Sequence, residues 1–279
     1  MTGNAVSGRI HVGIGGWSYE PWRKTFYPPQ TPKKLELEYA SRHLTAIEIN
    51  STFYRLQTPA VFAKWHDQTP ENFVFSVKAP RHIVNRKVLC ESGEAIERFI
   101  ESGLAALGAK LGPILWQLAP GKRFEPRDLE GFLRLLPSSV QSLPLRHALE
   151  VRHDSFMNAD FLALVRHHHV AMVFADSERY PRYADLTSDF VYARLMRCAA
   201  SVVTGYSTRA LAAWAKRARI WSQGADPEDL PRLEKSAPRP AQRDVFVFII
   251  NGAKERAPAA ACHLLSRLDS PPGARARKR

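Results

Sequence analysis

Alternation of aliphatic and polar residues in the stretches 47–50 and 149–152 decides the fold. The two stretches read Ile47-Glu48-Ile49-Asn50 and Leu149-Glu150-Val151-Arg152. Because residues two apart in a strand share a face, each stretch has one aliphatic and one polar face. The aliphatic face must be buried, and a carboxylate held on the opposite face of such a strand is costly without a partner. Glu48 and Glu150 are therefore expected to pair with other groups or to take part in function.

Eight segments of the chain carry strand signals, and most of them are followed by a helix signal. These segments are short apolar or alternating runs bounded by glycine, proline or polar clusters: Ile10–Gly15, Ala46–Asn50, Phe73–Lys78, Ile114–Leu118, His147–Arg152, Val170–Asp176, Phe190–Arg194 and Val245–Asn251. Between them, apolar residues recur at helical spacing, as at Leu129, Phe132, Leu133 and Leu136. The pattern predicts an α/β fold, a TIM-type (β/α)8 barrel, for which about 250 residues is a normal length.

The main alternative is a doubly wound open sheet. The nucleotide-binding form of that fold carries a G-x-G-x-x-G motif after its first strand. Residues 13–18 read GIGGWS and lack the third glycine at that spacing. The barrel is therefore the preferred interpretation.

Two segments depart from regular alternation. Residues 177–187, after the sixth strand, are too polar and too interrupted by proline for a full helix, so one helix of the barrel is expected to be missing or short. Residues 223–243 contain four prolines and are interpreted as a surface insertion before the last strand. We expect a single barrel domain over residues 1–270, followed by a basic, flexible tail at 271–279.

Composition and charge limit the class of protein. The chain has 279 residues, 45% of them hydrophobic, and a formal net charge of +13, which favours a polyanionic partner such as nucleic acid or a phosphorylated ligand. Three widely spaced cysteines suit a reducing compartment. With no apolar run long enough for a membrane span and no hydrophobic segment in residues 1–9, no membrane partner is expected and the protein is predicted to be cytoplasmic. The sequence leaves the oligomeric state open.

Strand parity predicts a polar mouth for the barrel. If the aliphatic residues face the helices, their alternates point inward. At the carboxyl ends of the strands the inward residues are then Gly15, Asn50, Lys78, Gln117, Arg152, Asp176, Arg194 and Asn251, with Glu48, Glu150 and Tyr192 one layer below. Active sites of such barrels lie at this C-terminal end.

An alternative is that these charges neutralise one another in a purely structural plug. Three carboxylates do balance three cations in number. Buried ion-pair networks often contribute little net stability, however, so a plug of this kind would be an expensive structure. A functional site is the preferred interpretation.

Several blocks of the chain resemble the YecE-like proteins, which carry the label domain of unknown function 72. The blocks span nearly the whole chain and include Gly15-Gly16-Trp17-Ser18-Tyr19, Glu48-Ile49-Asn50-Ser51-Thr52-Phe53-Tyr54, Lys78-Ala79-Pro80-Arg81, Gln117-Leu118, Glu150-Val151-Arg152-His153, Ala175-Asp176-Ser177 and Tyr192-Ala193-Arg194-Leu195. The resemblance implies a TIM barrel, compared in that family with barrels of the endonuclease IV and xylose isomerase type, and it implies no established activity. Two departures stand out: Met196-Arg197 replaces the usual His-Gly, and Asn251-Gly252 replaces paired asparagines.

A multinuclear metal centre is disfavoured. Zinc sites need histidines and carboxylates that converge without competing cations, whereas Lys78, Arg152 and Arg194 interleave with the predicted inward carboxylates. No metal ligand is therefore assigned and no cofactor is predicted. A single magnesium ion on Glu48, Glu150 or Asp176 is kept as an open alternative.

The mixed charge favours a phosphate-bearing ligand. Guanidinium forks suit phosphate, a lysine supplies a point charge, and a carboxylate beside them can act as general acid or base. The catalytic candidates are Glu48, Glu150 and Asp176. The substrate-binding candidates are Trp17, Asn50, Tyr54, Lys78, Arg81, Gln117, Arg152, His153, Tyr192, Arg194 and Asn251.

Three functions follow from this site. The first is an enzyme, a hydrolase or lyase, that acts on a phosphate-bearing and potentially nucleic-acid substrate. The second is a non-catalytic nucleic-acid-binding protein. The third, a sugar or sugar-phosphate isomerase, would require a metal ion or a well-placed histidine and is the weakest.

Overall fold

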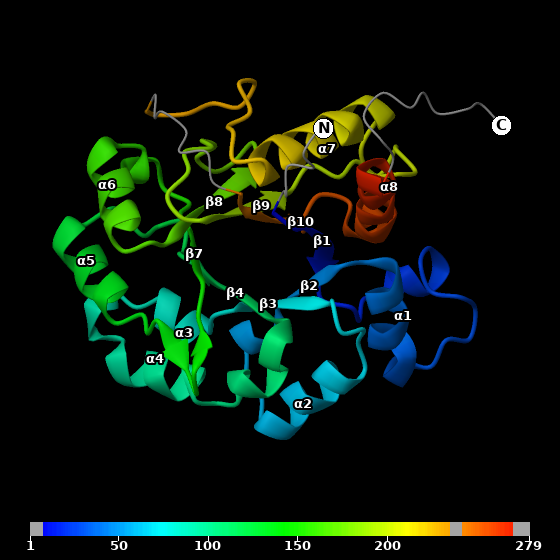
Figure 1. Cartoon of the computed structure of the whole chain (residues 1–279), viewed down its shortest axis with the longest axis horizontal. Coiled ribbons are helices and arrows are strands. Elements are labelled where there is room, and N and C mark those ends of the chain that lie inside the picture. The colour runs from blue at the N-terminus through cyan, green and yellow to red at the C-terminus, as the bar shows by residue number, and fades with distance from the viewer. Residues whose placement is uncertain (1–7, 235–241, 270–279) are drawn as a thin grey trace, which may run out of the picture.

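The computed structural model describes residues 8–234 and 242–269, and their strands form a closed barrel (Figure 1). Parallel strands pair in the order β1-β2-β3-β4-β7-β8-β9-β10, and β10 returns to β1. The barrel strands are β1 (Ile10–Gly15), β2 (Ala46–Ile49), β3 (Val74–Lys78), β4 (Leu111–Gln117), β7 (His147–Glu150), β8 (Ala171–Asp176), β9 (Phe190–Leu195) and β10 (Asp244–Ile249). The predicted TIM-type barrel is confirmed, and each predicted strand lies within a few residues of an observed one.

Helices surround the barrel on its outer face (Figure 1). They are α1 (Glu36–His43), α2 (Pro59–Asp67), α3 (Arg81–Val84), α4 (Gly93–Ile100), α5 (Pro126–Arg134), α6 (Ala159–His167), α7 (Thr208–Ser222) and α8 (Ala257–Asp269). A small hairpin of β5 (Ser139–Val140) and β6 (Leu143–Pro144), absent from the sequence-based expectation, precedes β7. None of the helices within the described ranges has the length and hydropathy that crossing a bilayer requires.

Two apolar layers separate the inside of the barrel from its outside. Outward residues such as Ile47 and Leu149 belong to the large core under the helices. Inward residues such as Phe190 and Phe246 form a second cluster that fills the interior towards the amino ends of the strands. Polar inward residues lie at both ends of the barrel: His11 and Asp244 near the amino ends of β1 and β10, where His11 stacks on Phe246, and the glutamates of β2 and β7 towards the carboxyl end.

No helix joins β8 to β9, as the sequence predicts for this crossover. The proline-rich insertion packs against the connecting loop: Ala184 N donates to Pro231 O at 2.8 Å, and the Asp185 carboxylate accepts from the backbone amides of Leu233 and Glu234 at 2.8 and 2.9 Å. The insertion thus covers part of the face that the missing helix leaves bare. Part of the insertion, residues 235–241, and the predicted basic tail at 271–279 lie outside the described residues.

Candidate active site

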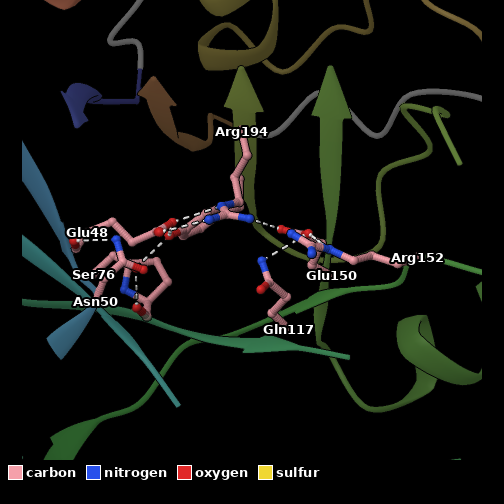
Figure 2. A network of polar contacts seen from close by, with 9 residues as sticks. Glu48, Asn50, Ser76, Gln117, Glu150, Arg152 and Arg194 are labelled. Atoms are coloured by element: carbon pink, nitrogen blue, oxygen red, sulfur yellow. Dashed lines mark hydrogen bonds and ion pairs between the residues drawn. The ribbon is translucent and has the colours of Figure 1, made fainter. Parts of the chain in front are cut away.

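Arg194 lies between two buried glutamates at the carboxyl end of the barrel (Figure 2). Its Nε and Nη2 donate to the two carboxylate oxygens of Glu48, each at 3.0 Å, and its Nη1 donates to Glu150 Oε2. The two glutamates are fully buried and come from β2 and from β7. Burial alone would lower the pKa of Arg194, but the two carboxylates outweigh it and raise that pKa above its usual value. The guanidinium of Arg194 therefore joins β2 and β7, the two strands in which aliphatic and polar residues alternate.

Glu150 accepts three hydrogen bonds from side chains. Its Oε1 accepts from Arg152 Nε at 2.6 Å and from Gln117 Nε2 at 3.1 Å, in addition to the bond from Arg194 (Figure 2). Burial would raise the pKa of this carboxyl, but the two arginines outweigh burial and hold the pKa below its usual value. An ionised carboxylate with this many donors is a poor general base, because any proton it accepted would compete with these bonds.

A second chain of hydrogen bonds reaches Glu48 from below. Tyr192 OH lies 2.8 Å from Glu48 Oε2 and 2.7 Å from Ser76 Oγ, and Ser76 Oγ donates to Pro113 O at 2.8 Å. Burial and the neighbouring Glu48 raise the pKa of Tyr192 well above its usual value. The hydroxyl therefore stays protonated and serves as a hydrogen-bond donor to the carboxylate.

Lys78 is the cation of this group that lacks a carboxylate partner. Its side chain is 8% exposed, and its Nζ lies 3.8 Å from the centroid of the Phe53 ring. Within residues 8–234 and 242–269, no hydrogen bond or ion pair joins this Nζ to another residue. Burial and Arg194 lower the pKa of Lys78 to about 8, against the opposing effect of Glu48 and Glu150.

A hollow of about 600 Å³ opens beside this network, at the carboxyl ends of β8, β9 and β10. It is lined by Ser177, Glu178, Arg179, Tyr180, Met196, Arg197, Cys198, Asn251 and Gly252. Tyr180 connects the hollow to the buried network, because the Arg152 guanidinium lies 4.3 Å from the centroid of its ring. Met196 borders the hollow with an apolar side chain.

The inward prediction for Asp176 is wrong. Its register partner on β9 is Leu195, which faces the helices, whereas the neighbouring Ala175 pairs with the inward Arg194. Asp176 lines a separate cavity of about 410 Å³. Other lining residues of this cavity include Phe174 on β8 and Trp214 on α7. Burial raises the pKa of Asp176, only partly offset by Arg197 and Arg182 at 3.9 and 4.0 Å.

The inward prediction for Asn251 is also wrong, although the residue stays near the mouth. On β10 the inward cluster continues through Phe248 to Ile250, so the next residue cannot share that face. Asn251 follows the strand, is exposed and borders the hollow. Asn50 remains with the buried network, where its Nδ2 donates to Glu48 O at 3.3 Å. It fits because Gly15 has no side chain: a Cβ there would lie 2.8 Å from Asn50 Nδ2.

The other ligand-binding candidates lie around the network. Trp17 packs edge-on against Trp65 of α2, with 5.0 Å between ring centroids. Tyr54 is 74% exposed, and Arg81, at the start of α3, is exposed as well. The ring of His153 accepts from Ser155 N and thereby caps a short turn. These contacts give Trp17 and His153 packing or capping roles, while Tyr54, whose ring packs edge-on against Phe53, and Arg81 lie at the surface.

Three residues of the site are absent from the sequence-based prediction. Ser76 lies two residues before Lys78 on β3, so strand parity alone could have identified it. Phe53 is contained in the block 48–54 but has no polar group to attract attention. Tyr180 comes from the irregular loop after β8, where no strand or helix repeat in the sequence predicts which way a side chain points.

Among the described residues, no group of three or more His, Cys, Asp or Glu side chains is arranged to hold a metal ion. All four carboxylate oxygens of Glu48 and Glu150 accept hydrogen bonds from arginine. A magnesium ion at either residue would lie beside a guanidinium, which repels it and competes for the same oxygens. The donor set therefore does not fit a metal at these two residues.

Fold and site together define a class: a closed (β/α)8 barrel whose C-terminal mouth holds a buried network of carboxylates and guanidiniums beside an unpaired lysine. Residues 11–278 match the family described as "Protein of unknown function DUF72", and the chain belongs to that family. The resemblance to the YecE-like proteins is thereby confirmed.

Two relatives illustrate the similarity in sequence. UPF0759 protein YecE of Escherichia coli (strain K12) is 29% identical over 149 residues, which are 53% of this chain and 50% of that protein. UPF0759 protein YunF of Bacillus subtilis (strain 168) is 27% identical over 157 residues, which are 54% of each. The matches thus span about half the length of each relative.

Two solved structures show the same fold. A DUF72 family protein from Thermotoga maritima MSB8 has a TM-score of 0.72 at 21% identity, covering 94% of this chain and 100% of that one. Another, from Enterococcus faecalis V583, has a TM-score of 0.69 at 20% identity, covering 94% and 96%. At these identities the likeness concerns the fold.

Proposed function

We propose that the protein is an enzyme, of the hydrolase or lyase class, that binds a phosphate-bearing substrate at the C-terminal mouth of its barrel. One observation carries the proposal: the two buried carboxylates are paired with Arg194 and Arg152, and the mouth holds a further cation in Lys78. The floor of the mouth thus has a surplus of positive charge when Lys78 is protonated. An anionic ligand is the natural complement of such a surplus.

Arg152 is the residue best placed to meet the phosphate. Its Nε is held by Glu150 and its Nη1 lies 3.4 Å from the hydroxyl of Tyr180, which lines the hollow, so the guanidinium plane is fixed next to that residue. No hydrogen bond from its Nη2 to another described residue is present. An oriented guanidinium with an open edge suits an oxyanion. On this view Glu48 and Glu150 act as positioning residues for the arginines, and Asp176 takes no part.

Binding of inorganic phosphate, measured by calorimetry, tests the site. We expect Arg152→Gln to weaken binding about tenfold or more, because a charge-assisted hydrogen bond contributes about 1.5–3 kcal/mol. The matched control is Arg134→Gln, which also removes an arginine paired with a glutamate but at the other end of the barrel. If Arg152→Gln binds phosphate as tightly as the wild type, the proposed site is wrong.

Turnover and salt dependence separate the alternatives. An enzyme converts a phosphodiester or another phosphate ester, whereas a nucleic-acid-binding protein holds a single-stranded oligonucleotide without converting it and loses affinity steeply with salt. Tight, salt-insensitive binding of an unphosphorylated sugar would instead favour the isomerase.

A further inference from the structure

Lys78 differs from the other buried lysine in what surrounds its ammonium group. Lys110 is 5% exposed, and its Nζ donates to His66 O, to Thr69 O at 2.7 Å and to Thr69 Oγ1 at 3.2 Å. Lys78 is 8% exposed and makes no such bond within the described part of the chain. A buried ammonium without acceptors is costly, so this arrangement needs a reason other than stability.

The position of Lys78 is fixed although its amine is unbonded. Its backbone carbonyl accepts from Thr52 Oγ1 at 2.7 Å, and its amine lies over the Phe53 ring. The charged groups that act on the amine come from three other strands: Arg194 from β9, Glu48 from β2, and Glu150 and Arg152 from the end of β7. The side chain is therefore held at the carboxyl end of the barrel, with a nitrogen that makes no hydrogen bond to the described residues.

We propose that Lys78 is a nucleophilic residue that forms a Schiff base with an aldehyde or ketone group of the substrate. That this substrate also carries a phosphate group rests on the proposed function above, whereas its carbonyl group does not. The neutral Nζ attacks the carbonyl carbon and forms a C–N bond. The resulting carbinolamine loses its hydroxyl group as water, with protons supplied by the amine and by solvent, and leaves a protonated imine. No electrons are gained or lost in the step.

The surroundings of Lys78 suit both states of this reaction. With a pKa near 8, a substantial fraction of the amine is neutral in weakly alkaline solution, whereas an ordinary lysine is almost fully protonated. The protonated imine carries one positive charge, as the ammonium does. Glu48 and Glu150, which favour the charged ammonium, also favour this product.

Reductive trapping tests the proposal. The full-length protein is incubated with glyceraldehyde 3-phosphate and sodium cyanoborohydride, which reduces an imine to a stable secondary amine, and the adduct is located by peptide mapping. We expect Lys78 to be modified on the order of tenfold faster than any other lysine at pH 8, with a rate that levels off above pH 8. Lys110, which is also buried but whose ammonium is hydrogen-bonded, should stay unmodified.

Two variants sharpen the test. Lys78→Arg keeps the positive charge but removes the primary amine, and should abolish the fast adduct. Lys34→Met removes an exposed lysine and should change nothing. Circular dichroism confirms that each variant folds, and the wild-type peptide map remains decisive if one does not.

The outcomes separate this inference from the proposed function. Modification spread over surface lysines with Lys78 unmodified overturns the inference, and phosphate binding then still decides the proposed function on its own. Fast trapping at Lys78 that is equal for glyceraldehyde and its phosphate supports the Schiff base and contradicts the phosphate site.

Discussion

Arg194 carries one positive charge and is held by two carboxylates from different sides of the barrel. Glu48 binds it through both oxygens, while Glu150 binds it through one and shares its other oxygen with Arg152 and Gln117. Each carboxylate is fully buried, so neither can regain water if its partner is lost. Removing one partner of such a pair is expected to cost far more than removing an exposed pair.

Glu150→Gln tests this expectation. The amide cannot neutralise Arg194 and Arg152, so we expect a loss of about 3 kcal/mol in the free energy of unfolding at pH 7, measured by urea denaturation. Because the folded-state pKa of Glu150 lies below its ordinary value of 4.5, the stabilisation is fully present above that value. The difference between wild type and variant should shrink as pH falls below 4.5.

The control is Glu130→Gln, which breaks the exposed pair with Arg134 on α5. It should cost less than about 1 kcal/mol. Equal losses for the two variants would mean that the buried network contributes no more to stability than a surface pair.

Lys78→Met should raise stability at neutral pH, which is unusual for a substitution at a buried site. The folded-state pKa is about 8 and the ordinary value is 10.5, so the unfolded chain holds the proton more tightly. Stability therefore rises with pH between these values, and below pH 8 the charged amine imposes its full cost. We expect the variant to be more stable by about 2 kcal/mol at pH 7, with the gain disappearing towards pH 10.5.

Lys110→Met is the matched comparison for this prediction. It removes three hydrogen bonds from a lysine of similar burial, and should lower the midpoint of urea unfolding at pH 7. A lower midpoint for Lys78→Met as well would identify Lys78 as a structural residue.

At the scale of elements, strand alternation predicts direction only where the two faces of a strand differ. On β2 and β7 one face is aliphatic and the other carries a glutamate, and the predicted directions of Glu48 and Glu150 agree with the structure. On β8 and β10 both faces are apolar, as Val173 beside Phe174 illustrates, so a polar residue at the strand end does not reveal its direction. The errors at Asp176 and Asn251 have this cause.

The pairing within the network lay beyond prediction for a different reason. Which carboxylates Arg194 reaches depends on how β9 is staggered against β2 and β7 when the barrel closes, and local sequence carries no information on that stagger. The irregular segments 177–187 and 223–243 are easier to predict from sequence, because proline and polar residues exclude a helix locally. Their mutual contact, through Asp185, could not be foreseen.

Asp185→Ala should loosen the insertion from the barrel. Asp185 is 2% exposed and accepts from two backbone amides, Leu233 N and Glu234 N. Leaving a buried donor unsatisfied costs about 1–3 kcal/mol, and these two bonds are only partly buried, so we expect a loss of about 1–2 kcal/mol in the free energy of unfolding. Hydrogen exchange at those two amides should become faster.

Asp229→Ala is the control on the same insertion. Asp229 pairs with Arg217 at the surface, and its side chain is 59% exposed. Its loss should cost less than about 1 kcal/mol and should leave exchange at residues 233 and 234 unchanged. If the two variants behave alike, Asp185 does not anchor the insertion.

At the scale of the whole molecule, the net charge of +13 and the mouth are separate sources of affinity for anions. A field produced by many surface cations attracts any polyanion and weakens steeply with salt. A site built from Arg152 and Lys78 recognises one phosphate group at fixed geometry, and its affinity depends on those residues. Oligonucleotide binding by itself therefore says little about the mouth.

Deleting residues 271–279 separates the two sources. The deletion removes four basic residues, Arg275, Arg277, Lys278 and Arg279. We expect weaker binding of a single-stranded oligonucleotide and a slope of log affinity against log salt that is shallower by about 0.7 for each lost contact. Binding of inorganic phosphate, measured by calorimetry, should be unchanged, whereas Arg152→Gln should weaken phosphate binding and leave most of the oligonucleotide's salt dependence in place. If the deletion weakens phosphate binding as strongly as Arg152→Gln does, the positive charge of the whole molecule, and not the geometry of the mouth, determines phosphate affinity.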